Sequence, residues 1–93
     1  MLHEFSIAET ETFQSSMQKN EFRKLYKKIY DYIYPQLRRN PYFGHNIKKL
    51  KGDYADIYRY RIGNHRLFYT IEESKVTVFI LDIADRKDAY KKK

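Results

Sequence analysis

Residues 57–72 decide the fold, and they read IYRYRIGNHRLFYTIE. Two runs rich in aromatic and β-branched residues, Ile57–Ile62 and His65–Glu72, are separated only by Gly63-Asn64. A two-residue connection of this kind forms a β-hairpin turn, because glycine readily adopts the positive φ that the turn requires. The stretch therefore predicts two antiparallel strands whose register is set by the turn.

The predicted register separates the hairpin into two faces. Arg61 lies directly opposite Arg66, and Arg59 lies two residues away on the same face. We place three apolar side chains beside these arginines, namely Phe68, Phe79 and Leu81. The opposite face carries the expected core, namely Tyr58, Tyr60, Ile62, His65, Leu67, Tyr69, Ile71, Val76, Val78 and Ile80.

The three arginines indicate a site for a polyanion. Like charges directly opposite each other on paired strands are destabilising, and a small domain has little stability to lose. A bound phosphodiester chain relieves the repulsion, since guanidinium groups bind phosphate oxygens and stay protonated. Neighbouring aromatic rings can stack on unpaired bases, so the pattern favours single-stranded nucleic acid. The alternative is a solvated face on which these arginines form salt bridges to Asp53, Asp56 or Glu72, and spacing alone does not decide between the two.

Two helices and two further strands are predicted around the hairpin. Lys75–Ile83 is the third strand of a meander, Leu2–Ala8 is a short strand, and Glu9–Met17 is a short helix. A longer amphipathic helix follows, because apolar residues recur at three- and four-residue spacing from Phe22 to Leu37.

The boundaries of the long helix follow from capping and proline chemistry. Asn20 is the expected N-cap, and Pro35 is expected to end or kink the last turn. Asn40–Asp53 is predicted as a basic connecting loop. The order β-α-α-β-β-β indicates a two-layer α+β domain, with two N-terminal helices packed on one face of a mainly antiparallel four-stranded sheet.

Composition limits the class of protein. The 93 residues suffice for one domain, spanning 1–93, and the net charge of +7 with a pI near 9.6 favours nucleic acid or an acidic protein as partner. No cysteine is present, and the longest purely apolar run, Val78–Leu81, is too short to cross a membrane. The start of the chain lacks the pattern of a signal peptide, so we expect a cytoplasmic protein without a membrane partner.

Three motifs occur in a fixed order. They are KLKG at residues 49–52, the hairpin itself, and DRKDAY at residues 85–90. Together they resemble the RelE/ParE toxin superfamily, whose members are toxins of bacterial toxin–antitoxin pairs. The resemblance implies one of two activities, because the RelE branch cleaves mRNA in the ribosomal A site, whereas the ParE branch poisons DNA gyrase.

The resemblance also implies roles for individual residues. Arg59 and Arg61 fall where RelE-type toxins place two lysines that bind and activate the RNA, and Arg66 falls on a strand arginine. Arginine is a poor proton acceptor, so these side chains are expected to stabilise charge instead of acting as a general base. Arg86 lies near the late arginine of the family, and Tyr90 falls on the C-terminal tyrosine that orients the nucleotide or takes part in proton transfer. The expected RNA-binding residues are Lys48, Lys49, Lys51, Phe68 and Lys87.

Histidine and metal chemistry are not part of the prediction. Alternation along the strand places His65 on the helix-covered face, which favours a structural role. His3 and His45 are isolated, and the sequence contains no paired-carboxylate or glycine-rich phosphate motif. We therefore expect neither a metal nor another cofactor.

The leading functional prediction is a ribosome-dependent, metal-independent endoribonuclease that cleaves mRNA by attack of a ribose 2′-hydroxyl. Its expected partners are mRNA, the ribosome and a cognate acidic antitoxin, while its own oligomeric state is left open. One alternative is a ParE-like inhibitor of DNA gyrase. Another is a catalytically degenerate binding module, in keeping with arginines where the RelE branch has lysines.

Overall fold

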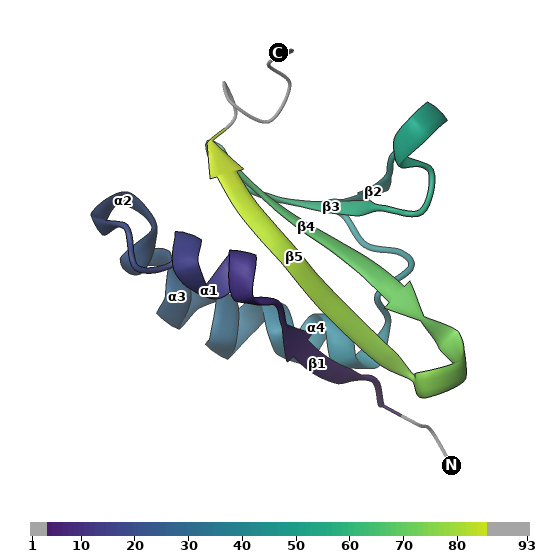
Figure 1. Ribbon diagram of the computed structural model, residues 1–93. Coiled ribbons are helices and arrows are strands. Elements are labelled where there is room, and N and C mark those ends of the chain that lie inside the picture. Colours follow the sequence, from purple (N-terminus) through teal and green to yellow (C-terminus); the bar gives the residue numbers. More distant parts are fainter. Residues whose placement is uncertain (1–3, 86–93) are drawn as a thin grey trace.

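The computed structural model describes residues 4–85, which form a layer of helices against one face of a twisted sheet (Figure 1). The elements in the helical part of the chain are β1 (Ser6–Glu9), α1 (Glu11–Ser16), α2 (Asn20–Arg23), α3 (Leu25–Lys28), the π-helical turn η1 (Ile29–Ile33) and α4 (Tyr34–Arg39). The remaining elements are β2 (Ile47–Lys49), the 3-10 turn η2 (Gly52–Tyr54), β3 (Tyr58–Ile62), β4 (His65–Glu72), the 3-10 turn η3 (Glu73–Lys75) and β5 (Thr77–Asp85).

The sheet has the strand order β1-β5-β4-β3-β2, in which β1 is parallel to β5 and the other neighbours are antiparallel. The predicted α+β class and the predicted placement of the helices on one face are confirmed. The sheet has five strands instead of four, because β2 forms inside the segment predicted as a loop. Its three residues include Lys48 and Lys49, so it lacks the apolar alternation by which a strand is found in a sequence.

The long helix is a run of helical turns that differs from the prediction at both ends. It starts with Lys19 as the N-cap, which makes no side-chain capping bond, and Asn20 is already inside the first turn. Tyr34 keeps helical angles before Pro35 (φ −58°, ψ −44°), and its N–H bonds to the carbonyl of Ile29, five residues back. Because this wider turn precedes Pro35, the proline stands at the start of α4, where its missing donor is least needed. The helix therefore continues to Arg39.

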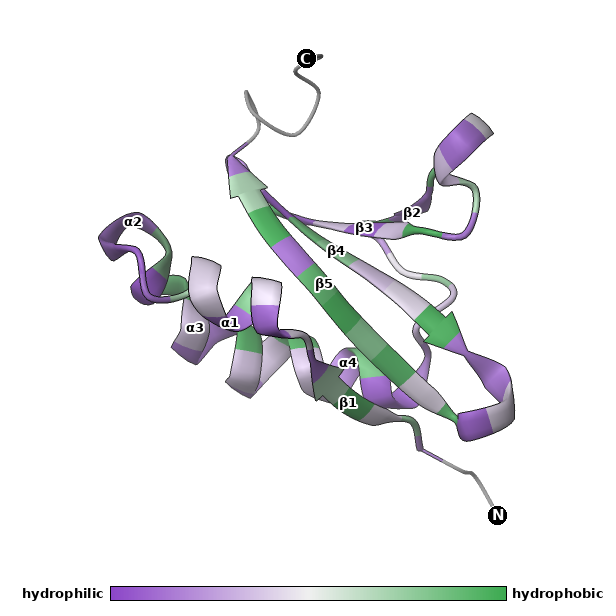
Figure 2. Cartoon of the chain, in the orientation of Figure 1, coloured by the Kyte–Doolittle hydropathy of each residue, from purple (hydrophilic) through white to green (hydrophobic). Residues whose placement is uncertain are grey.

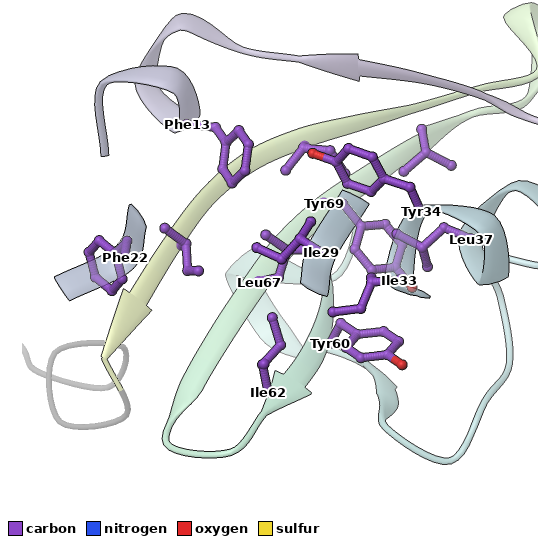
Figure 3. Packing of buried hydrophobic residues seen from close by; sticks show 13 residues of the cluster. Phe13, Phe22, Ile29, Ile33, Tyr34, Leu37, Tyr60, Ile62, Leu67 and Tyr69 are labelled. Carbon is purple, nitrogen blue, oxygen red and sulfur yellow. The ribbon is translucent and has the colours of Figure 1, made fainter. Parts of the chain in front are cut away.

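The core lies between the helices and the sheet (Figure 3). Its buried residues are Phe13, Phe22, Ile29, Ile33, Tyr34, Leu37, Tyr60, Ile62, Leu67, Tyr69, Val78, Ile80 and Ile83. Figure 2 shows the apolar character concentrated along β5, with polar residues in the turns at the chain's surface. Two residues with the spacing of core residues are instead exposed, namely Tyr30 on the apolar side of the long helix, at 53%, and Val76, at 38%. Val76 follows η3 with a φ of 48°, so it closes the turn instead of continuing the strand.

A β-bulge in β5 shifts the side-chain alternation near its end. Phe68 pairs with Asp82 and Tyr69 with Ile80, which leaves Leu81 as the extra residue. Leu81 was predicted on the arginine face, and the bulge takes it out of that regular alternation. Thr10 stabilises the same region, since its hydroxyl contacts the carbonyls of Ile80 and Leu81 at 2.9 Å each. It also accepts the Phe13 N–H at 3.1 Å, so it caps α1 and attaches it to β5.

Candidate nucleic-acid interface

The hairpin has the predicted register. Gly63 has a φ of 57°, Arg61 pairs with Arg66, and Arg59 pairs with Phe68. Directly opposite residues of antiparallel strands project from the same face, and residues two apart on one strand do so as well. Arg59, Arg61 and Arg66 therefore share the sheet face that the helices leave uncovered, and we name them the arginine row.

The three arginines differ in exposure. Arg61 is exposed, Arg59 is half-buried, and Arg66 is only 3% exposed. The guanidinium of Arg66 donates to the carbonyl of the neighbouring His65 at 3.4 Å. The row thus combines a cation that solvent reaches freely with one that is largely removed from water. Coulomb interactions of the buried cation are screened less than those of an exposed one.

Arg61 is exposed to solvent, but the alternative in which it forms a salt bridge to Asp53, Asp56 or Glu72 does not apply to it. Within residues 4–85, no carboxylate forms an ion pair with this side chain. The carboxylate of Glu72, one of the expected partners, accepts the Ser74 hydroxyl at 3.0 Å. Arg61 therefore lies directly opposite Arg66 and forms no ion pair with a carboxylate of residues 4–85.

The lysines predicted to bind RNA are divided between surfaces. Lys48 pairs with Arg59, so it is on the face of the arginine row and is exposed. Lys49 pairs with Tyr58 and projects to the other face, with its Nζ 5.9 Å from the centre of the Tyr58 ring. Lys51 lies beyond the strand, at the N-cap of η2. Of these three lysines, only Lys48 extends the arginine row, and this distinction depends on the register of β2, which was not predicted.

Aromatic and polar residues complete the face. Phe68 is half-buried and stands in register between Arg59 and Asp82, while Phe79 stands opposite Thr70. Phe68 and Phe79 are thus on the predicted face. Asp82 accepts the Ser16 hydroxyl of α1 at 2.6 Å, so the bulge connects its carboxylate to the helical layer.

Three predicted site residues, Arg86, Lys87 and Tyr90, lie outside the described residues. The described part of β5 ends at Asp85, whose carboxylate is 3.4 Å from Nε2 of His65. His65 packs edge-to-face on Phe22 with ring centres 5.5 Å apart. Its side chain is therefore on the helix-covered face, as predicted.

Two further properties concern the described part of the chain. Residues 4–85 hold no group of three or more His, Asp or Glu side chains placed to bind a metal ion. Over the same range, every helix is too short or too polar to cross a lipid bilayer.

Solved structures of toxins share this fold. The toxin–antitoxin complex RelBE2 from Mycobacterium tuberculosis contains a chain with 26% sequence identity and a TM-score of 0.76, and the alignment covers 92% of this chain and 95% of that one. The RelB–RelE antitoxin–toxin complex from Methanococcus jannaschii gives 26% identity and a TM-score of 0.63, over 89% and 94% of the two chains. The isolated RelE toxin of E. coli is similar in fold, with 22% identity, a TM-score of 0.63 and coverage of 87% and 83%.

Comparison of the sequence with protein families also points to a toxin. No curated protein matches this chain. Residues 17–90, however, match the family described as ParE toxin of type II toxin–antitoxin system, parDE. The match includes the long helix, the hairpin with the arginine row, and the last motif. The chain therefore belongs to the ParE toxin family, within the RelE/ParE superfamily, and is the toxin of a toxin–antitoxin system.

Proposed function

We propose that this toxin is a ribosome-dependent endoribonuclease of the RelE type that cleaves mRNA without a metal ion. The proposal rests above all on the pairing of Arg61 with Arg66, with Arg59 on the same face. Such a row of guanidiniums matches a phosphodiester chain in charge and in hydrogen-bond geometry. Lys48 adds a fourth cation to the same face.

In the proposed reaction, a ribose 2′-hydroxyl attacks the adjacent phosphorus atom. The new bond closes a 2′,3′-cyclic phosphate, and the bond to the 5′-oxygen of the next nucleotide breaks. The 2′-hydroxyl proton leaves to a base, and the 5′-oxygen takes up a proton as it departs. Tyr90 is the proposed residue for orienting the nucleotide or for one of these proton transfers, and Arg86 is the proposed further cation.

The arginines act on charge in this scheme. Negative charge accumulates on the nonbridging oxygens in the transition state, and preorganised cations stabilise it more than they stabilise the substrate. Arg66 has the stronger field because it is buried, and Arg61 is exposed to the incoming RNA. Phe68 is proposed to stack on a base, while Lys49, Lys51 and Lys87 contact RNA outside the scissile bond.

The proposed protein partner is an acidic antitoxin that neutralises the charge of +7. Support comes from the two solved complexes in which similar chains are bound to an antitoxin. A groove of about 580 Å³ between α1 and α3 offers such a partner an apolar floor that includes Met17 and Tyr26. The lining is of mixed charge, because Lys27 is paired with Asp31 at 2.7 Å, while Arg23 offers a cation to an acidic residue of the partner. We propose that the pair acts in the cytoplasm, where mRNA and ribosomes occur, and that residues 1–93 form one domain.

The test is a reconstituted translation reaction in which mRNA ends are mapped. Wild-type toxin is expected to cut mRNA in the ribosomal A site, while Arg61→Gln combined with Arg66→Met abolishes cutting. These replacements keep most of the side-chain volume, and circular dichroism checks that the fold persists. Lys75→Gln, in the turn η3 that follows β4, is the control and should cut like the wild type. Equal cutting by the double variant would contradict the site.

The second candidate function is inhibition of DNA gyrase. It is favoured by the match to the ParE family over residues 17–90. A supercoiling assay separates the two functions, because gyrase inhibition without RNA cleavage supports the ParE-like activity. A degenerate binding module would give neither effect, and its expression would not arrest growth.

A further inference from the structure

A small pocket opens at the corner of the sheet where the end of β3 extends past the start of β2. β2 begins at Ile47, opposite Tyr60, so the last residues of β3 extend past it. The Arg61 N–H donates to the carbonyl of Asn46 at 3.0 Å, which holds the incoming loop against this end of the strand. The pocket has a volume of about 180 Å³ and is lined by Lys28, Tyr32, Ile33, Asn46, Tyr60, Arg61, Ile62 and Gly63.

The lining combines three kinds of chemistry. Its apolar part comes from the buried core residues Ile33, Tyr60 and Ile62. Lys28 and Arg61 are exposed cations, and the lining contains no acidic residue. Such a pocket favours a ligand that is anionic and also presents a flat, weakly polar surface.

Tyr32 is the residue that the fold does not explain. It is 72% exposed, although the next residue, Ile33, is buried in the core. An exposed aromatic ring beside cations is the arrangement with which proteins stack on unpaired bases. Asn46 also lines the pocket and is partly buried, and its side-chain amide can both donate to and accept from a base edge.

We propose that this corner pocket, formed by Lys28, Tyr32, Asn46 and Arg61, binds the nucleotide next to the scissile one in single-stranded RNA. Tyr32 stacks on its base, Lys28 binds its phosphate and Asn46 reads its edge. Arg61 belongs both to the pocket and to the arginine row, so a bound RNA strand passes from one to the other without a gap. The inference rests on the proposed ribonuclease function and adds residues that determine which RNA is held.

The experiment measures binding of a fluorescein-labelled 2′-O-methyl hexanucleotide by anisotropy. This probe cannot be cut by the proposed reaction, because it lacks a free 2′-hydroxyl group. Tyr32→Ala is expected to weaken binding roughly 5- to 150-fold, the range for loss of one base stack, and Tyr32→Phe should retain it. Tyr54→Ala is the matched control, since Tyr54 is 60% exposed and outside the pocket.

Two further variants separate charge from base reading. Lys28→Ala should lower the slope of log affinity against log salt by about 0.7, the value for one lost phosphate contact on a single strand, while Lys24→Ala leaves the slope unchanged. Asn46→Ala should reduce the differences in affinity among homopolymer probes of the four bases. Tyr32 and Lys28 are exposed, so their truncation leaves the core intact.

The outcomes distinguish the pocket from the proposed function. If Arg61→Gln with Arg66→Met abolishes binding, but Tyr32→Ala and Lys28→Ala bind like the wild type, the pocket is refuted and the ribonuclease proposal stands. If the wild-type toxin does not bind the probe at low salt, the pocket is refuted, while the ribonuclease proposal is decided separately by cutting in the translation reaction.

Discussion

Replacing Arg61 by glutamine should stabilise the protein, although it removes a residue of the proposed site. Arg61 lies directly opposite Arg66 and has no ion pair with a carboxylate within residues 4–85. Charge pairs at opposed positions of two strands change stability by roughly 0.2–1 kcal/mol. Arg61 is exposed while Arg66 is 3% exposed, so solvent screens the pair only in part. Arg59, on the same face, adds a second like charge, and we expect a gain of about 0.5–1 kcal/mol.

Urea denaturation followed by circular dichroism measures this gain. A small domain loses about 1–3 kcal/mol of stability per molar urea, so the midpoint for Arg61→Gln should rise by about 0.2–1 M. The gain should shrink at high salt, because the Debye length falls from about 10 Å at 0.1 M to about 3 Å at 1 M. Lys75→Gln removes a charge in the turn η3, which follows β4, and should leave the midpoint unchanged. Lower stability of Arg61→Gln, or a gain independent of salt, would refute the idea that repulsion is stored at this site.

Other predictions concern the rest of the fold. Glu9→Ala should lower the free energy of unfolding by about 2–3 kcal/mol, because one oxygen of Glu9 accepts the hydroxyls of both Tyr26 and Tyr34 at 2.7 Å. An unchanged urea midpoint would show that these two hydrogen bonds do not contribute to the stability of the fold. Burial, with a further contribution from Glu9, raises the pKa of Tyr34 and raises that of Tyr26 to about 12 from an ordinary 10.0. As the pH rises, the two tyrosine hydroxyls therefore lose their protons in the unfolded chain before they do so in the folded protein. Their contribution to the free energy of unfolding is fully present below pH 10 and falls as the pH rises towards 12. Tyr34→Phe should make this alkaline fall shallower, and an identical pH profile would count against the buried hydroxyl. Gly63→Ala should cost about 1 kcal/mol, since the φ of 57° disfavours a side chain although no atom lies within 4 Å of the new Cβ. A neutral effect in thermal unfolding would contradict this turn geometry.

The hairpin could be predicted from sequence because its information is local. Gly63-Asn64 sets the turn, and alternation then assigns every side chain of β3 and β4 to a face. The pairing of Arg61 with Arg66 follows from this alone, so the arginine row is predictable from the sequence.

The parts that were missed depend on contacts between distant segments. β2 is too short and too basic to be seen as a strand, so the separation of Lys48 from Lys49 could not be predicted. The bulge at Leu81 depends on how β5 packs against β4 and Thr10, which leaves no local signal. The wide helical turn that lets the helix continue past Pro35 was not predicted either, because the rule for residues before proline favours a helix end or a kink there.

The periodicity of apolar residues also does not predict how exposed a single side chain is. Tyr30 has the spacing of a core residue and is nevertheless half exposed, because it lines the groove between α1 and α3. Tyr32 was not singled out, since an aromatic residue on the polar side of a helix has no special pattern. The proposed role of Tyr32 follows only from the structure, because Tyr32 and the end of β3 line the same pocket.

The central claim is that the arginine row holds the charged oxygens of a phosphodiester, and its most direct test compares two probes. One is the 2′-O-methyl hexanucleotide, and the other is the same molecule with neutral methylphosphonate links in place of the phosphates. Wild-type toxin should bind the charged probe far more tightly than the neutral one, and Arg61→Gln with Arg66→Met should lose most of this preference. An undiminished preference in the double variant would contradict the account.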